Sequence, residues 1–161
     1  MTQKLSKEAW LKCVDSMPIF GIDMIILINK SDILMGKRIN NPAKGKLFVP
    51  GGRVYKNESR EEAFKRILIN ETGLDCNIND SISMGLFEHF YNTNFLSDEN
   101  SNTHYIIEAR LIKFNVENKK REIKVNQQHS ELEWININKS KSKQIHYYSK
   151  LYIDQLIKLI K

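Results

Sequence analysis

A glycine turn followed by a helix with one carboxylate is the stretch of this sequence best suited to chemistry. The turn is 50–52 (Pro-Gly-Gly), and a helix is predicted after Ser59 because Ser59 and Glu62 have the spacing of a capping box. Gly73 is well placed to end this helix in a left-handed conformation. Glu71 lies on the apolar face of the helix, near its end. A loop–helix unit of this kind brings a backbone carbonyl of the turn close to the carboxylate, and two such hard oxygens suit Mg²⁺.

The elements that position this unit are predicted from hydrophobic periodicity. Strands are expected at 22–28, 33–35, 47–49, 82–91, 103–114 and 132–135, the first two forming a hairpin. Further helices are expected at 6–14 and 147–160. Strands of this order with an internal and a terminal helix indicate an α/β fold, in which helices pack on a mixed β-sheet.

Two polar segments are predicted to be loops. Residues 92–102, between two long strands, are predicted to form a mobile loop that could act as a lid. Residues 117–124 are charged and are predicted to form a solvated turn.

Composition limits the architecture and the partners. A chain of 161 residues with 41% hydrophobic residues has room for one domain and one good core. The net charge of +6 favours an anionic partner, such as a nucleotide, a nucleic acid or an acidic membrane; alternatively, the positive charges face solvent. Cys13 and Cys76 stand alone, as reduced cysteines of a cytosolic protein do. Neither a signal peptide nor an apolar run of ~20 residues is evident, so a cytoplasmic protein is expected.

Several polar side chains outside the turn–helix unit are candidates for a pocket. Arg38 and Arg53 bracket the segment that leads into the helix, and guanidinium groups match phosphate oxygens bidentately, although single surface arginines are often only solvated. Asp23 lies near the start of a strand, where a carboxylate either meets solvent at an edge or points into a pocket. His89 and His104 lie in strands and, on sequence alone, are more simply structural.

The turn–helix unit resembles the Nudix box. Seven residues match this family motif at its spacing: Gly52, Glu58, Arg66, Leu68, Glu71, Gly73 and Leu74. Ile67 and Asn70 depart from the motif, which has glutamate at both positions. In most members those glutamates share one helical face with the carboxylate at Glu71 and hold more than one divalent ion. With Glu71 alone, one Mg²⁺ is predicted, and it would neutralise a departing diphosphate.

The two departures are similar to the altered box of GDP-mannose mannosyl hydrolases. The similarity covers about residues 23–135, including the segments GKRINNPAKGKLFVPGGRV, EHFYNTNF, THYIIEARLIKF and QQHSELEWI. It implies a single Nudix domain over residues 1–161, an α/β/α sandwich, that forms a homodimer. It also implies hydrolysis of a nucleoside diphosphate sugar, GDP-mannose or else GDP-glucose, to GDP and free sugar. Water would attack the anomeric carbon, with inversion.

The same resemblance implies roles for individual residues. The ligands of Mg²⁺, or of Mn²⁺ in its place, would be the carbonyl of Gly51, the carboxylate of Glu71 and the side chain of Gln128. The catalytic groups would be His129 as general base, with Arg38 and Arg53 holding the diphosphate. The other residues in contact with substrate would be Asp23, His89 and Tyr105. Glu58 and Arg66 are predicted to form a structural ion pair.

Three alternatives remain open on the sequence. The first is a Nudix pyrophosphatase that cleaves a P–O bond of a nucleotide sugar. The second is a catalytically silent module that binds nucleotides or RNA, which the loss of carboxylates and the basic charge would suit. The third is a hydrolase of a different activated sugar. The favoured interpretation is the small-molecule enzyme, with no nucleic acid and no membrane as partner.

Overall fold

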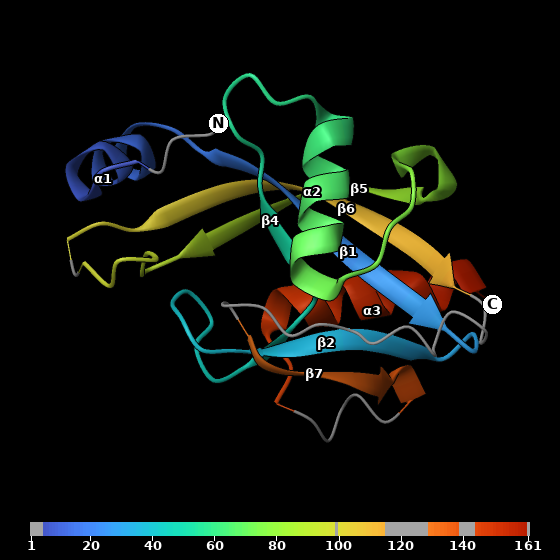
Figure 1. Cartoon of the computed structure of the whole chain (residues 1–161). Helices are drawn as coiled ribbons and strands as arrows, with labels where there is room; N and C mark the ends of the chain where they lie inside the picture. Colours follow the sequence, from blue (N-terminus) through green and yellow to red (C-terminus); the bar gives the residue numbers. More distant parts are fainter. Residues whose placement is uncertain (1–4, 99, 115–128, 139–143, 161) are drawn as a thin grey trace.

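The computed structural model describes residues 5–98, 100–114, 129–138 and 144–160 (Figure 1). The helices are α1 (Lys7–Ser16), α2 (Arg60–Thr72) and α3 (Tyr147–Ile160), with a 3₁₀ turn at Ile78–Asp80. The strands are β1 (Ile19–Ile28), β2 (Asp32–Arg38), β3 (Leu47–Phe48), β4 (Gly51–Arg53), β5 (Ile82–Tyr91), β6 (Thr103–Phe114) and β7 (His129–Asn136). The expected α/β fold is confirmed: three helices pack on a mixed sheet.

The sheet is built around β1. Its strand order is β3-β2-β1-β6-β5, with β4 paired to β1 and β7 paired to β2. β1 runs parallel to β6 along its whole length and antiparallel to the other strands that it touches. The first half of β1 pairs with β4, whereas only its last two residues pair with β2. β1 therefore holds the glycine turn directly beside the middle of the sheet.

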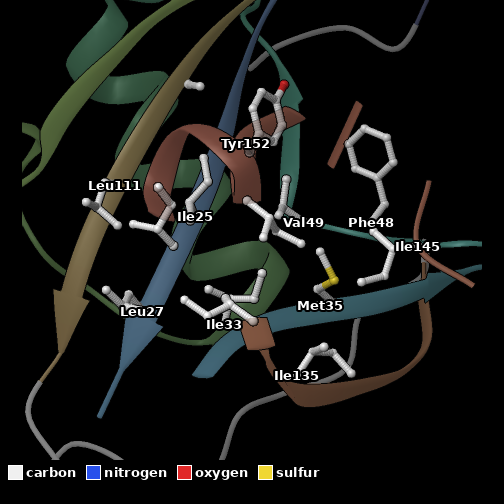
Figure 2. Packing of buried hydrophobic residues seen from close by; sticks show 14 of the residues in the cluster. Ile25, Leu27, Ile33, Met35, Phe48, Val49, Leu111, Ile135, Ile145 and Tyr152 are labelled. Carbon is white, nitrogen blue, oxygen red and sulfur yellow. The ribbon is translucent and has the colours of Figure 1, made fainter. Parts of the chain in front are cut away.

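Helices cover the two faces of the sheet because side chains of β1 alternate between them. Met24 and Ile26 face a cluster that includes Phe64 and Leu68 of α2. Ile25 faces the other cluster, which contains residues of α3 and is drawn in Figure 2. In Figure 1, α2 and α3 accordingly lie on opposite sides of the sheet. The expected α/β/α sandwich is observed.

The start and the end of α2 match the sequence prediction. Ser59 Oγ accepts from the backbone N–H of Glu62, and the Glu62 carboxylate accepts from the backbone N–H of Ser59 at 2.7 Å. Gly73 ends the helix in the left-handed region at φ 73°, where a side chain would be strained. The helix is thus fixed at both ends, with Glu71 in its last turn.

Several strand boundaries differ from the prediction because pairing extends the strands, as in β2, which spans Asp32–Arg38 rather than 33–35. β1 begins at Ile19 rather than Ile22, since its first residues pair with β6 from Tyr105 onward. β7 begins at His129 rather than Leu132, because His129 pairs with Arg38 of β2. The expected strand at 132–135 left His129 in the loop ahead of it, and that placement is wrong. The predicted solvated turn at 117–124 lies outside the described residues.

None of the helices in the described part of the chain has the length and apolar character needed to cross a membrane.

Candidate functional site

A cavity of about 800 Å³ lies where α1, β1, β4, α2, β5 and β6 meet. Seven of the residues singled out from the sequence line it: Asp23, Arg38, Gly51, Arg53, Glu71, His89 and Tyr105. They come from segments that are far apart in the chain, and the sheet brings them together. The size is typical of a site that takes a small molecule.

The glycine turn forms the floor of this cavity. Gly51 of β4 pairs directly with Asp23 of β1. A Cβ atom at Gly51 would overlap Asp23 Oδ1, and one at Gly52 would lie 3.2 Å from Ile67 Cγ1. A side chain at Gly51 would therefore displace Asp23, and one at Gly52 would press on Ile67, so glycines leave only backbone at this part of the cavity wall.

Glu71 supplies a buried carboxylate on the same cavity. It is 5% exposed, and neighbouring Ile67 packs into the apolar cluster under α2 at 2% exposure. Asn70 also lines the cavity, so the box presents one carboxylate and one amide where the family motif has several acids. Within the described residues, no group of three or more His, Cys, Asp or Glu side chains could hold a metal ion.

The donor set fits a Mg²⁺ ion that is bound by few protein ligands. Glu71 and the backbone of Gly51 both line the cavity, and both offer hard oxygen atoms. Mg²⁺ typically keeps several waters and adds substrate phosphates to one or two carboxylates. Such an ion needs no dedicated cage of side chains.

The two candidate arginines stand over aromatic rings at the cavity. Arg53 Cζ lies 5.1 Å from the ring centroid of Trp10 and 4.7 Å from that of Tyr55. Arg38 Cζ lies 5.9 Å from the Phe48 ring, and Arg38 Nε donates to the Pro42 carbonyl at 2.8 Å. Aromatic faces hold a guanidinium in place without consuming its N–H donors. Most donors of both arginines therefore remain available to an anion.

Glu58 and Arg66 form the predicted structural ion pair. Arg66 donates through Nε and Nη2 to the two oxygens of Glu58, and Nη2 also donates to the Arg53 carbonyl at 2.9 Å. The hydrogen bond from Arg66 lowers the pKa of Glu58. This pair ties α2 to β4 and so fixes the turn against the helix.

Asp23 and His89 meet through a tyrosine of α3. Tyr152 Oη donates to Asp23 Oδ2 at 2.8 Å and lies 2.9 Å from His89 Nε2. Burial raises the pKa of Asp23 to about 7, against the opposing effects of Tyr152 and the positive charge of Arg38. Burial also lowers the pKa of His89 to about 3. Asp23 and His89 are 5% and 2% exposed, so neither is a solvated edge residue.

Aromatic residues form the wall beside His89. The His89 ring stacks on Tyr148 at a centroid distance of 3.8 Å, and Tyr91 packs edge-on against both His89 and Tyr105. Burial raises the pKa of Tyr91 and of Tyr105. These phenols stay protonated at neutral pH and can donate to a ligand.

The loop predicted to be a lid has an internal framework. The Asn94 side chain is fully buried, donates to the carbonyls of Asp98 and Ser101 and accepts from the backbone N–H of Leu96. Ser97 accepts from Asn41 Nδ2 at 3.0 Å, which joins this loop to the one after β2.

The remaining two candidates lie at the edge of what the structure describes. The backbone of His129 pairs with that of Arg38, which lines the cavity. Gln128 lies outside the described residues.

Sequence reasoning missed Tyr152, Trp10 and Tyr55 as parts of the site. Tyr152 belongs to a helix whose apolar period was visible, but its hydroxyl lies 129 positions from its partner Asp23 along the chain. Trp10 and Tyr55 flank Arg53 and line the cavity. The only sign of a role for Tyr152 in the sequence was that it is a polar aromatic residue within an amphipathic helix. Such residues are common in ordinary cores, so this sign is weak.

The chain is similar in sequence or in fold to known proteins. The chain is 32% identical to the low-salt glycan biosynthesis protein Agl8 of Haloferax volcanii, over 96% of this chain and 92% of the relative. The NUDIX domain of Shewanella oneidensis NrtR, solved in complex with ADP ribose, superposes with a TM-score of 0.69 at 12% identity, covering 98% of this chain and 100% of that one. A MutT NUDIX hydrolase from Burkholderia pseudomallei superposes with a TM-score of 0.68 at 20% identity, covering 87% and 98%.

The family model described as the NUDIX domain matches residues 18–155. That span contains the glycine turn, α2 and each residue named above as lining the cavity except Trp10. The chain therefore belongs to the Nudix hydrolase family.

Proposed function

We propose that this protein is a Mg²⁺-dependent hydrolase that splits a nucleoside diphosphate sugar at the anomeric carbon, releasing a nucleoside diphosphate and a free sugar. GDP-mannose is the first candidate substrate, on the resemblance described above, and GDP-glucose is the second. The similarity to a glycan biosynthesis protein supports a sugar-linked substrate.

One observation carries the proposal: Glu71 is the sole acid left of the three that the family motif supplies from this helical face. Ile67 is buried in the apolar cluster, and Asn70 carries no charge. Several bound ions favour attack of water at phosphorus, whereas a single ion suits neutralisation of a leaving group. When the diphosphate departs from carbon, only this neutralisation of the leaving group is required.

In this proposal, each group of site residues has its own role in the reaction. Arg38 and Arg53 bind the diphosphate and stabilise its charge as the bond to the sugar breaks. Asp23, His89 and Tyr105 contact the substrate. His129 takes the proton of the attacking water, whose oxygen bonds to the anomeric carbon while the diphosphate keeps the bridging oxygen.

The metal site of this proposal consists of the Gly51 carbonyl, Glu71 and Gln128. Bound there, Mg²⁺ or Mn²⁺ would act as a Lewis acid on the diphosphate oxygens.

The test is hydrolysis of a panel of nucleotide sugars with Mg²⁺ in ¹⁸O-water. We expect GDP and free sugar as products, with the label in the sugar. Label in a phosphate, with GMP and a sugar 1-phosphate as products, would establish P–O cleavage instead. Binding of GDP or RNA without turnover of any member of the panel would favour the silent module.

A homodimer is also proposed, from the resemblance. Large apolar residues on the edge strand β5 support it: Ile82, Leu86 and Phe90 are 48%, 67% and 61% exposed. Sedimentation equilibrium of the full chain should give twice the mass of the 161-residue protein; a monomer mass at micromolar concentration would refute it.

A further inference from the structure

The hydroxyl group of Tyr152 lies behind the cavity wall, between the two polar residues that face the cavity. Tyr152 is fully buried, while its partners Asp23 and His89 line the cavity. Figure 2 shows its oxygen pointing away from the aliphatic residues of the cluster. The tyrosine therefore reaches a ligand only through Asp23 and His89.

The direction of these hydrogen bonds follows from counting protons. A phenol has one proton to donate and can accept through its oxygen. When Asp23 is ionised it cannot donate, so Tyr152 donates that proton to Asp23 Oδ2 at 2.8 Å. The contact of 2.9 Å with His89 Nε2 must then be one in which the imidazole donates. A neutral imidazole carries one proton, so Nδ1 is left as an acceptor.

Two further observations support a neutral, fixed imidazole. Burial, followed by the charge of His146, lowers the pKa of His89 to about 3, so the ring is neutral in ordinary buffers. Tyr148 stacks on the ring with an interplanar angle of 14°, which fixes the plane of its nitrogens. Among the described residues, His89 Nδ1 has no hydrogen-bond partner of its own.

We propose that Tyr152 is a positioning residue that holds His89 in its Nε2–H tautomer, so that His89 and the ionised form of Asp23 offer only hydrogen-bond acceptors to the ligand. The complementary ligand group is a pair of hydroxyl donors, as in a sugar. This choice of ligand rests on the proposed function, whereas the tautomer does not.

The tautomer is tested by NMR of the full chain labelled with ¹⁵N-histidine, at about pH 9, where carboxylates are ionised. The chain has four histidines, and His89→Gln identifies the signal of interest by its loss. We expect the proton of His89 on Nε2 in the unmodified protein. A proton on Nδ1 would overturn the proposal. The tautomer is read from the unmodified protein, and His89→Gln serves only to assign the signal.

The role of Tyr152 is tested with Tyr152→Phe, which keeps the ring and removes the hydroxyl group. We expect His89 to populate the Nδ1–H tautomer in this variant. Tyr147→Phe is the matched control, since Tyr147 also lies in α3 and is 63% exposed. An unchanged His89 tautomer in folded Tyr152→Phe would show that Tyr152 does not set it.

Kinetic measurements then show whether Tyr152 positions His89 and Asp23 for the sugar or only supports the structure of the whole site. For Tyr152→Phe, kcat/KM on GDP-mannose should fall by about 10-fold or more, while inhibition by GDP, which lacks the sugar, should change less than about twofold. An equal loss of GDP binding would mean a merely structural role and would overturn the positioning role. If the unmodified protein hydrolyses no nucleotide sugar, the proposed function fails, and the NMR result still decides the tautomer.

Discussion

At the scale of single residues, the site contains two buried carboxylates, Asp23 and Glu71. Asp23 is buried against Tyr152, and burial raises its pKa to about 7. Glu71 sits in the last turn of α2 on the same cavity, and its charge adds to the rise in the pKa of Asp23. Arg38 opposes that rise. A cation or phosphate group bound in this cavity would therefore also change the pKa of Asp23, as the charges of Arg38 and Glu71 do.

Glu71→Gln should weaken the dependence on Mg²⁺, because an amide keeps the shape of the side chain and loses its charge. The concentration of Mg²⁺ for half-maximal turnover should rise by at least about tenfold. Glu61→Gln is the control, since Glu61 is an exposed residue in the first turn of the same helix. Equal Mg²⁺ titrations for both variants would exclude Glu71 as a ligand.

His129→Gln should lower kcat by roughly 10²–10⁴-fold, the usual contribution of a general base. Binding of GDP and Mg²⁺, measured by calorimetry, should remain close to that of the unmodified protein. The variant tests a role that rests on resemblance, since the structure shows only that the backbone of His129 pairs with Arg38. A rate equal to that of the parent protein would assign the base elsewhere.

Asp23 should make the metal-free protein less stable as pH rises from about 4 to 7. Its pKa is raised on folding from 3.8 to about 7, so the folded state holds a proton that the unfolded chain has released. At pH 8, Asp23→Asn should therefore raise the free energy of unfolding by on the order of 4 kcal/mol relative to its effect at pH 3, where Asp23 is protonated in both states. Urea unfolding at both pH values measures it; an equal effect at both would show that Asp23 is not a titrating buried acid.

At the scale of secondary structure, one ion pair fixes the relation of the turn to the helix. Arg66 of α2 bonds Glu58 in the preceding loop and the Arg53 carbonyl of β4, and its Cζ lies 4.0 Å from the centroid of the Tyr55 ring. Only a planar guanidinium makes all of these contacts at once. The pair thus has a positional role in a site whose proposed metal and phosphate ligands come from both elements.

Arg66→Lys should therefore lower the free energy of unfolding by about 1–2 kcal/mol, despite the unchanged charge. Arg60→Lys is the matched control, since Arg60 is 56% exposed and its contact with Glu108 is 3.7 Å long. Its effect should be close to zero. Chemical unfolding of the two variants compares them, and equal stabilities would mean that the fork geometry of Arg66 contributes nothing.

At the scale of the whole molecule, the two faces of the sheet serve the site differently. α2 supplies the candidate metal ligand on one face. α3 covers the other face and supplies Tyr148 and Tyr152, which hold His89 and Asp23. The C-terminal helix α3 therefore does more than cover the hydrophobic core. It also helps to build the wall of the cavity.

Leu156→Ala should cost about 2–5 kcal/mol of stability, because Leu156 is fully buried between α3 and the sheet. Leu159→Ala makes the same change at a residue that is 55% exposed, and its effect should lie within about 0.5 kcal/mol. Thermal and urea unfolding compare the pair. Similar losses for both would contradict the packing of α3 described here.

The local elements of this fold were largely predictable from the sequence. The strands Ile82–Tyr91 and Thr103–Phe114 and the helix Tyr147–Ile160 have the expected bounds, and the capping box and Gly73 delimit α2. Such features depend on near neighbours in the chain, through periodicity and caps. Pairing between distant segments does not, which explains why the starts of β1 and β7 were misplaced.

By itself the sequence determined the Nudix box, the single acid Glu71 that remains at positions 67, 70 and 71, and the arginines that flank the turn. Only the tertiary structure decided that Asp23 and His89 are buried, that Gly51 must lack a side chain, and that Tyr152 joins Asp23 to His89. The physical reason is that motif spacing follows from the geometry of one helix and one turn. Burial, pKa and the direction of a hydrogen bond depend instead on partners that the sheet brings together from the two ends of the chain.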